Sequence, residues 1–134
     1  MQATVLVVDD KADVRLSASF LLNNHNYQVI EAESPLHAKE LIAQQQVDLI
    51  LLDMNYSGDT TSGQEGLDFI SSLSKDNINI PVIAMTAWSS VELAVQAMQI
   101  GAGDFIAKPW DNQRLLQVIK QQLRLQGLEQ QNKS

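Results

Sequence analysis

Three carboxylates, one hydroxyl and one amine follow short apolar runs in this sequence. Asp9 and Asp10 end the first run and Asp53 ends the third, whereas Thr86 follows the fourth and Lys108 the fifth. If the runs are parallel strands, their carboxyl ends meet at one edge of a sheet, where such folds bind ligands. The five side chains are therefore expected to share one pocket.

Three carboxylates in one pocket repel one another unless a cation is present. Mg²⁺ prefers oxygen ligands, usually one or two carboxylates together with waters and phosphate oxygens. The sequence has no G-x-x-x-x-G-K loop, so a bound nucleotide is not expected. Without a nucleotide, the three carboxylates and the lysine favour a phosphoryl group that is carried covalently as an aspartyl phosphate. Asp53, at the end of its run, is predicted to be exposed so that it can react.

The apolar runs predict a parallel sheet that is buried on both faces, since they are rich in Val, Ile and Leu without strict alternation. They span residues 4–8, 27–32, 47–52, 80–85 and 104–107. Segments with helical spacing separate them, and the predicted caps of those helices are Ser34-Pro35, Ser62 with Glu65, Ser89 with Glu92, and Asp111. Five strands alternating with five helices predict a doubly wound α/β fold.

Composition narrows the class of protein. The 134 residues suit one compact domain. A formal charge of −7 argues against direct binding of nucleic acid or an anionic membrane. The absence of cysteine excludes disulfides and thiolate chemistry. No apolar run approaches the roughly 18 residues that cross a bilayer, so a cytoplasmic domain is expected.

Four motifs together resemble the receiver domain of two-component response regulators. These motifs are "VLVVDD", "LILLDM", "PVIAMTA" and "DFIAKPW", each at a predicted strand end and in the family's order. The resemblance covers residues 4 to about 124. It implies a flavodoxin-like (βα)5 sandwich with strand order 2-1-3-4-5. Residues 1–124 would form the receiver domain, and 125–134 the end of the last helix and the start of a linker.

The resemblance also implies how a phosphoryl group is accepted. Asp53 would be the phosphoacceptor for a sensor histidine kinase. Asp10, Asp53 and the backbone carbonyl of Asn55 would bind Mg²⁺, and Asp9 would act through a metal-bound water. The domain would thus catalyse its own phosphorylation and slow dephosphorylation, without being an enzyme in the usual sense.

The remaining family positions imply a conformational switch. Lys108 would pair with the acceptor carboxylate and then with the phosphoryl oxygens, and a cis bond to Pro109 would aim its side chain. Thr86 would donate its hydroxyl to the phosphoryl group. Phe105 matches the aromatic residue that turns inward once Thr86 has moved.

Two features indicate partners. The loop "NYSGDTTSG" after Asp53 is longer than the commonest receiver form and is similar to NtrC-like receivers, which precede AAA+ and DNA-binding domains of transcriptional activators. The predicted fourth helix carries two apolar stripes, one formed by Val91, Ala94, Val95 and Met98 and the other by Leu93, Ala97 and Ile100. Because a surface helix needs one stripe, the spare one predicts a homodimer interface with the fifth strand and helix.

Two other functions remain open. Haloacid-dehalogenase-like phosphotransferases also use an aspartate after a parallel strand, but they place a second acid two positions later, where this chain has Asn55. A pseudo-receiver would bind partners without phosphorylation. Degenerate receivers usually lose the acceptor, an acid or the lysine, all of which are present here. Only a test of phosphate uptake separates a pseudo-receiver from a phosphoacceptor.

Overall fold

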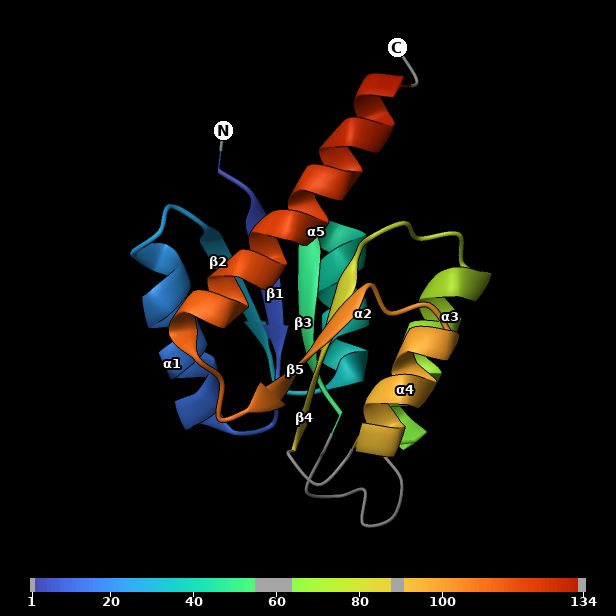
Figure 1. Cartoon of the computed structure of the whole chain (residues 1–134). Coiled ribbons are helices and arrows are strands. Elements are labelled where there is room, and N and C mark those ends of the chain that lie inside the picture. Colours follow the sequence, from blue (N-terminus) through green and yellow to red (C-terminus); the bar gives the residue numbers. More distant parts are fainter. Residues whose placement is uncertain (1, 55–63, 88–90, 133–134) are drawn as a thin grey trace.

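The computed structural model describes residues 2–54, 64–87 and 91–132 (Figure 1). Strands and helices alternate along the chain. The strands are β1 (Thr4–Val8), β2 (Gln28–Ala32), β3 (Leu49–Asp53), β4 (Val82–Ala87) and β5 (Asp104–Lys108). The helices are α1 (Ala12–Asn23), α2 (Pro35–Gln44), α3 (Gln64–Lys75), α4 (Val91–Gln99) and α5 (Asn112–Asn132).

The five strands form one parallel sheet in the order β2-β1-β3-β4-β5. This order confirms the predicted doubly wound fold. The strand boundaries differ from the predicted ones by up to two residues. Pro81, for example, lacks a backbone N–H and lies just before β4, where its carbonyl accepts a hydrogen bond from Ile50 at 3.0 Å.

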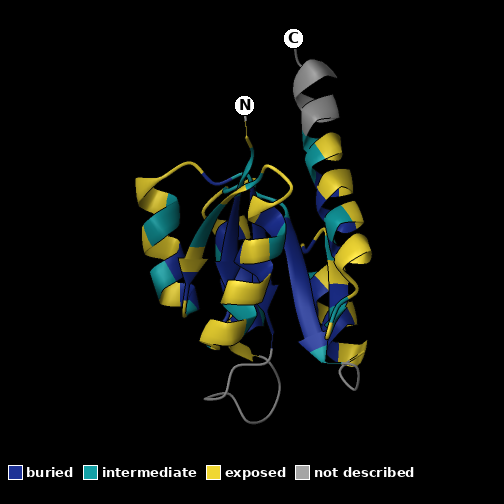
Figure 2. Ribbon diagram, turned by 90° about the vertical axis from the view of Figure 1, so that its left-hand side faces the viewer, coloured by how far each residue is buried: buried dark blue, intermediate teal, exposed yellow. Residues whose placement is uncertain are grey.

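Two apolar cores lie on opposite faces of the sheet. Alternation along β3 directs Leu49 and Leu51 to one core and Ile50 and Leu52 to the other. The first core also contains residues of α1 and α5, whereas the second contains residues of α2, α3 and α4. Figure 2 shows the buried strands between helices whose outer surfaces are exposed. All four side chains are fully buried, which explains why the strand reads as a continuous apolar run.

The helix starts follow the predicted capping residues where the structure describes them. The Ser34 hydroxyl accepts a hydrogen bond from the backbone N–H of His37 at 3.1 Å, and Pro35 begins α2. Helix α5 begins directly after Asp111, whose carbonyl accepts from the N–H of Leu115 at 2.9 Å. The predicted caps Ser62 and Ser89 lie outside the described residues.

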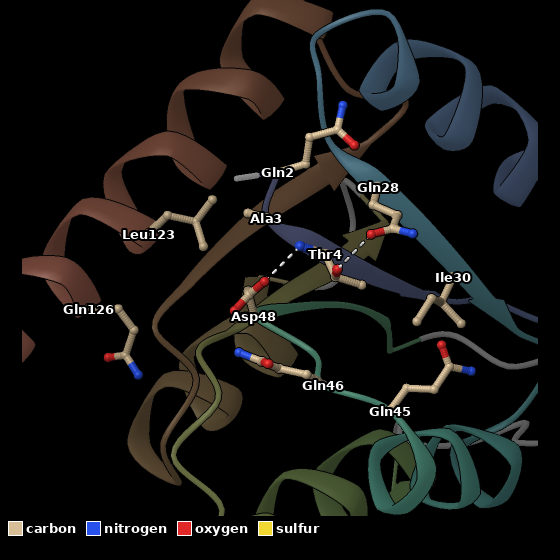
Figure 3. Close-up of a pocket in the computed structure, with 10 residues that line it drawn as sticks. All are labelled: Gln2, Ala3, Thr4, Gln28, Ile30, Gln45, Gln46, Asp48, Leu123 and Gln126. Atoms are coloured by element: carbon tan, nitrogen blue, oxygen red, sulfur yellow. Dashed lines mark hydrogen bonds between the residues drawn. The ribbon is translucent and has the colours of Figure 1, made fainter.

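The start of β1 and the end of α5 lie at the same edge of the molecule (Figure 1). A cavity of about 560 Å³ opens at this edge, between the first residues of the strands and α5 (Figure 3). In it the backbone N–H of Thr4 donates to the carboxylate of Asp48 at 2.7 Å. The cavity is therefore at the amino ends of the strands, and the predicted site is at their carboxyl ends.

Candidate functional site

Three aspartates meet at the carboxyl ends of the neighbouring strands β1 and β3. Asp9 and Asp10 follow β1, and Asp53 is the last residue of the adjacent strand β3. One carboxylate oxygen from each of the three lies within 4.8 Å of the others. Asp9 and Asp53 are fully buried and Asp10 is partly buried. The convergence predicted from the sequence is therefore present.

Lys108 enters this acidic cluster from the edge strand β5. Its Nζ lies 2.9 Å from Oδ1 of Asp53 and 3.1 Å from Oδ2 of Asp9. Burial lowers the pKa of the Lys108 ammonium, but the hydrogen bonds and negative charges of Asp53 and Asp9 outweigh burial and raise the pKa above its usual value. Lys108 is therefore a cation at neutral pH, and it links the ends of β1, β3 and β5.

Asp53 differs from the sequence prediction in one respect. It was expected to be exposed, but its residue surface is fully buried, so that expectation is wrong. The physical reason is its neighbours: Asp53 ends the central strand, and Lys108 and the other two carboxylates lie against it. Lys108 therefore occupies Oδ1 of Asp53 in this structure.

Asp9 is held by partners around its whole polar surface. Its N–H donates to the carbonyl of Ala32 at 3.1 Å, and its Oδ1 accepts from the N–H of Lys11 at 2.9 Å. Its own carbonyl accepts a 2.7 Å hydrogen bond from Nη1 of Arg15 on α1. Lys108 completes the set through Oδ2. Asp9 is thus a fixed part of the site's framework.

Arg15 is not among the residues that the motifs predict. Its Nε is 3.2 Å from Oε1 of Glu31 on β2, and the other oxygen of Glu31 accepts from the hydroxyl of Ser19 at 3.1 Å. A sequence signal exists, because Arg15 is on the helix that begins just after Asp10. That signal alone does not distinguish it from a surface arginine, since the contact with the Asp9 carbonyl depends on how α1 packs.

The predicted switch residues lie on β4 and β5. Thr86 immediately follows Met85, the residue that pairs with Asp53, and it is buried. Thr86 pairs with Ala107, and strand alternation therefore puts Phe105 on the same face of the sheet. Phe105 is 44% exposed. The predicted cis bond between Lys108 and Pro109 is present.

Helix α4 carries an exposed apolar surface, which we term the α4 stripe: Val91, Val95 and Met98, exposed by 67%, 49% and 40%. Leu93, Ala94 and Ala97 on the same helix are buried. The second predicted stripe, which contains Leu93 and Ala97, therefore packs toward the core, and the spare stripe is the one that contains Val91, except that Ala94 faces the core. Phe105 adds a further exposed apolar side chain on the neighbouring strand β5.

The acidic cluster fits a divalent cation that binds oxygen. Its donors are carboxylates only, which suits Mg²⁺ and not a metal that requires nitrogen or sulfur. Asp10 and Asp53 would hold the ion. Asn55, whose carbonyl was predicted as a further ligand, lies outside the described residues.

Comparison with known proteins identifies the family. A model of the response regulator receiver domain matches residues 5–120. Sporulation initiation phosphotransferase F of Bacillus subtilis is 29% identical, over 95% of this chain and 98% of that protein. Response regulator protein PilR of Pseudomonas aeruginosa is 33% identical, over 92% of this chain but only 27% of its own length.

Solved structures agree with this result. NtrX from Brucella abortus superposes with a TM-score of 0.89 at 28% identity, over 99% of this chain and 29% of that one. PilR and NtrX-like proteins are NtrC-family regulators, so the similarity to that branch inferred from the loop after Asp53 is confirmed. None of the helices in the described part of the chain is both long and apolar enough to span a membrane. The chain belongs to the receiver domain family of two-component response regulators.

Proposed function

We propose that this receiver domain accepts a phosphoryl group from a sensor histidine kinase on Asp53, with Mg²⁺ as cofactor, in the cytoplasm. The observation that carries the proposal is the Lys108 ammonium bound to Asp53 inside a cluster of three carboxylates. A lysine opposite an acidic cluster is the charge arrangement that suits a cation and a phosphoryl group together.

In this proposal each side chain of the site has one task. Asp10, Asp53 and the carbonyl of Asn55 would hold Mg²⁺, and Asp9 would act on it through a water. The metal supplies charge neutralisation of the phosphoryl oxygens. Lys108 leaves Oδ1 of Asp53 and donates to a phosphoryl oxygen, and Thr86 donates its hydroxyl to another.

The chemical step needs no general base. A carboxylate oxygen of Asp53 forms a bond to phosphorus while the bond from phosphorus to the donor breaks, and the donor keeps that electron pair. The donor is a phosphohistidine imidazole or, in a test, acetyl phosphate. The attacking oxygen belongs to the carboxylate of Asp53, and the Lys108 ammonium beside it balances negative charge at the site. Catalysis is then a matter of position and charge, as in other phosphoryl transfers.

The added dianion is proposed to shift the domain between two conformations. Thr86 moves toward the phosphoryl group, and Phe105, now 44% exposed, turns inward beside it. Reversing a 1:99 bias needs about 5.5 kcal/mol of differential binding. Charge-assisted hydrogen bonds from Thr86, Lys108 and backbone amides together supply a free energy of that order.

Two exposed apolar surfaces suit two protein partners. On α1, Leu16 and Phe20 are exposed and are proposed to contact the kinase. The α4 stripe with Phe105 is proposed as the homodimer interface of α4, β5 and α5. We further propose residues 1–124 as the receiver and 125–134 as the start of a linker toward AAA+ and DNA-binding output domains, as in the NtrC-like relatives.

Intact mass after incubation with acetyl phosphate and Mg²⁺ tests the proposal. One phosphoryl adduct is expected on the wild-type protein, and none on Asp53→Asn. Asp13→Asn is the matched control, because Asp13 is an exposed acid on α1, and it should be modified like the wild type. If the wild type binds Mg²⁺ but takes no adduct, the domain is instead an interaction module that works without phosphorylation.

A further inference from the structure

We propose that Arg15 is a positioning residue: held by Glu31, it fixes the peptide between Asp9 and Asp10 and so aims the Asp10 carboxylate at the divalent cation. The inference rests on the proposed Mg²⁺ site. Its basis is the 2.7 Å hydrogen bond from Nη1 of Arg15 to the carbonyl of Asp9. That carbonyl belongs to the peptide that joins the two acids.

Because the peptide is planar, the contact with the Asp9 carbonyl also constrains Asp10. A peptide unit is rigid, so a fixed carbonyl oxygen of Asp9 also fixes the N–H and Cα of Asp10. The other polar groups of Asp9 are already bound, to the Ala32 carbonyl, the Lys11 N–H and the Lys108 ammonium. The carbonyl of Asp9 belongs to the peptide that leads into Asp10, and the Arg15 side chain binds this carbonyl.

Arg15 is itself held from a second direction. Its Nε contacts Oε1 of Glu31 at 3.2 Å while Nη1 contacts Asp9, and the planar guanidinium makes both contacts possible at once. Ser19 donates to the other oxygen of Glu31 at 3.1 Å and thereby orients that carboxylate. Ser19 is buried and the Arg15 side chain is 17% exposed, whereas the Glu31 side chain is 42% exposed, so the Arg15 end of these contacts is shielded and the Glu31 end is open to solvent.

If Arg15 served only to tie α1 to β2, less of this geometry would be explained. The bond between Ser19 and Glu31 already joins those two elements. A connection alone would also not require a hydrogen bond to the backbone of an acidic-site residue. Arg15 also brings a positive charge near the carboxylates, and the test must separate this charge from the geometry of the side chain. Arg15→Lys retains the charge but cannot reproduce the two-way planar contact.

The test is Mg²⁺ affinity, measured by calorimetric titration of the whole chain. Loss of a partner that orients a metal ligand typically weakens binding by about 10- to 100-fold. We expect Kd to rise about tenfold in both Arg15→Met and Arg15→Lys, and less in Glu31→Gln. Arg114→Met, an exposed arginine on α5, is the matched control and should leave Kd unchanged. Wild-type affinity in Arg15→Lys would overturn the positioning role.

Hydrogen exchange of the metal-free protein gives a readout that does not depend on activity. The amides of Asp10 and Lys11 should exchange faster in Arg15→Met than in the wild type, whereas amides of the central strand β3 should not change. If Arg15→Met does not fold, Glu31→Gln carries the same test, because it removes the negative charge that holds Arg15 and keeps the guanidinium. Unchanged exchange in Glu31→Gln together with unchanged Mg²⁺ affinity would overturn the inference.

The two proposals fail separately. If the wild type binds Mg²⁺ without forming a phosphoryl adduct, while Arg15→Lys and Arg15→Met bind Mg²⁺ more weakly, Arg15 keeps its role and phosphorylation is rejected. If the wild type forms the adduct and Arg15→Met binds Mg²⁺ normally, the inference about Arg15 is rejected alone. If the wild type binds no Mg²⁺, the inference about Arg15 is rejected with the cation site.

Discussion

The ammonium of Lys108 lies 2.9 Å from Oδ1 of Asp53, although β4 separates the strands that carry the two residues. The same ammonium reaches Asp9 beyond β3, so one cation joins the ends of three strands. Without that cation, three carboxylates within 4.8 Å of one another would repel and destabilise the fold. The side chain proposed to bind the phosphoryl group therefore also stabilises the domain before phosphorylation.

Lys108→Met should lower the free energy of unfolding by about 2 kcal/mol in buffer with EDTA, because it leaves buried carboxylates without their cation. Mg²⁺ should reduce this loss by supplying another positive charge. Urea denaturation with and without Mg²⁺ measures both effects. Lys120→Met, at an exposed position on α5, is the control and should cost far less. Equal losses in the two variants would show that the Lys108 contacts do not stabilise the fold.

The Lys108 contribution should depend on pH in a defined direction. Because the pKa of Lys108 is raised on folding, its stabilisation is fully present below the usual lysine value of 10.5 and is lost as the pH rises through the higher folded value. The difference in unfolding free energy between wild type and Lys108→Met should stay constant from neutral pH to about pH 10 and then fall. A difference that already falls near pH 8 would contradict a raised pKa.

Mg²⁺ should stabilise the wild-type domain through Asp10. A ligand at ten times its Kd adds about 1.4 kcal/mol to the free energy of unfolding. Asp10→Asn should lose most of this gain. Asp13→Asn changes an exposed acid on α1, three residues after Asp10, and should keep it. The shift of the urea midpoint on adding Mg²⁺ is the measurement. A gain of equal size in Asp10→Asn would remove Asp10 from the cation site.

Gly66→Ala should destabilise the domain at the end of β3. A Cβ at this position would lie 2.7 Å from Sδ of Met54, and Met54 is fully buried directly after Asp53. Overpacking costs about 1–3 kcal/mol, and the better helix propensity of alanine returns up to about 1 kcal/mol. Thermal or urea denaturation should therefore show a net loss. Met54→Val in the same chain should make the Gly66→Ala cost smaller, and strictly additive losses would contradict the overlap.

The α4 stripe should mediate self-association of the phosphorylated domain. Val95→Glu introduces a charge into the exposed apolar surface and should weaken a symmetric dimer by more than about tenfold, because the charge meets its own copy. Sedimentation with and without beryllofluoride, a phosphoryl mimic, measures the effect. Leu36→Glu, at another exposed apolar position on α2, is the control. If both variants dimerise like the wild type, the interface lies elsewhere.

The sequence by itself determined the fold and the members of the acidic site. Buried parallel strands must be apolar on both faces, so runs such as "LILL" are readable without a structure, and the residues that follow them lie at one edge. This is why Asp9, Asp10, Asp53, Thr86 and Lys108 could be assigned to the same edge. Ser34 was readable as a cap because capping chemistry is local.

Only the tertiary structure decided what depends on neighbours that are distant in the chain. Burial of Asp53 follows from the approach of Lys108 across β4, and the contact of Arg15 with Asp9 follows from the packing of α1 against β2. The choice between two apolar stripes on α4 depended on which side of the helix meets the sheet. Apolar periodicity specifies that a face is buried, but the partners of that face are set by packing between elements.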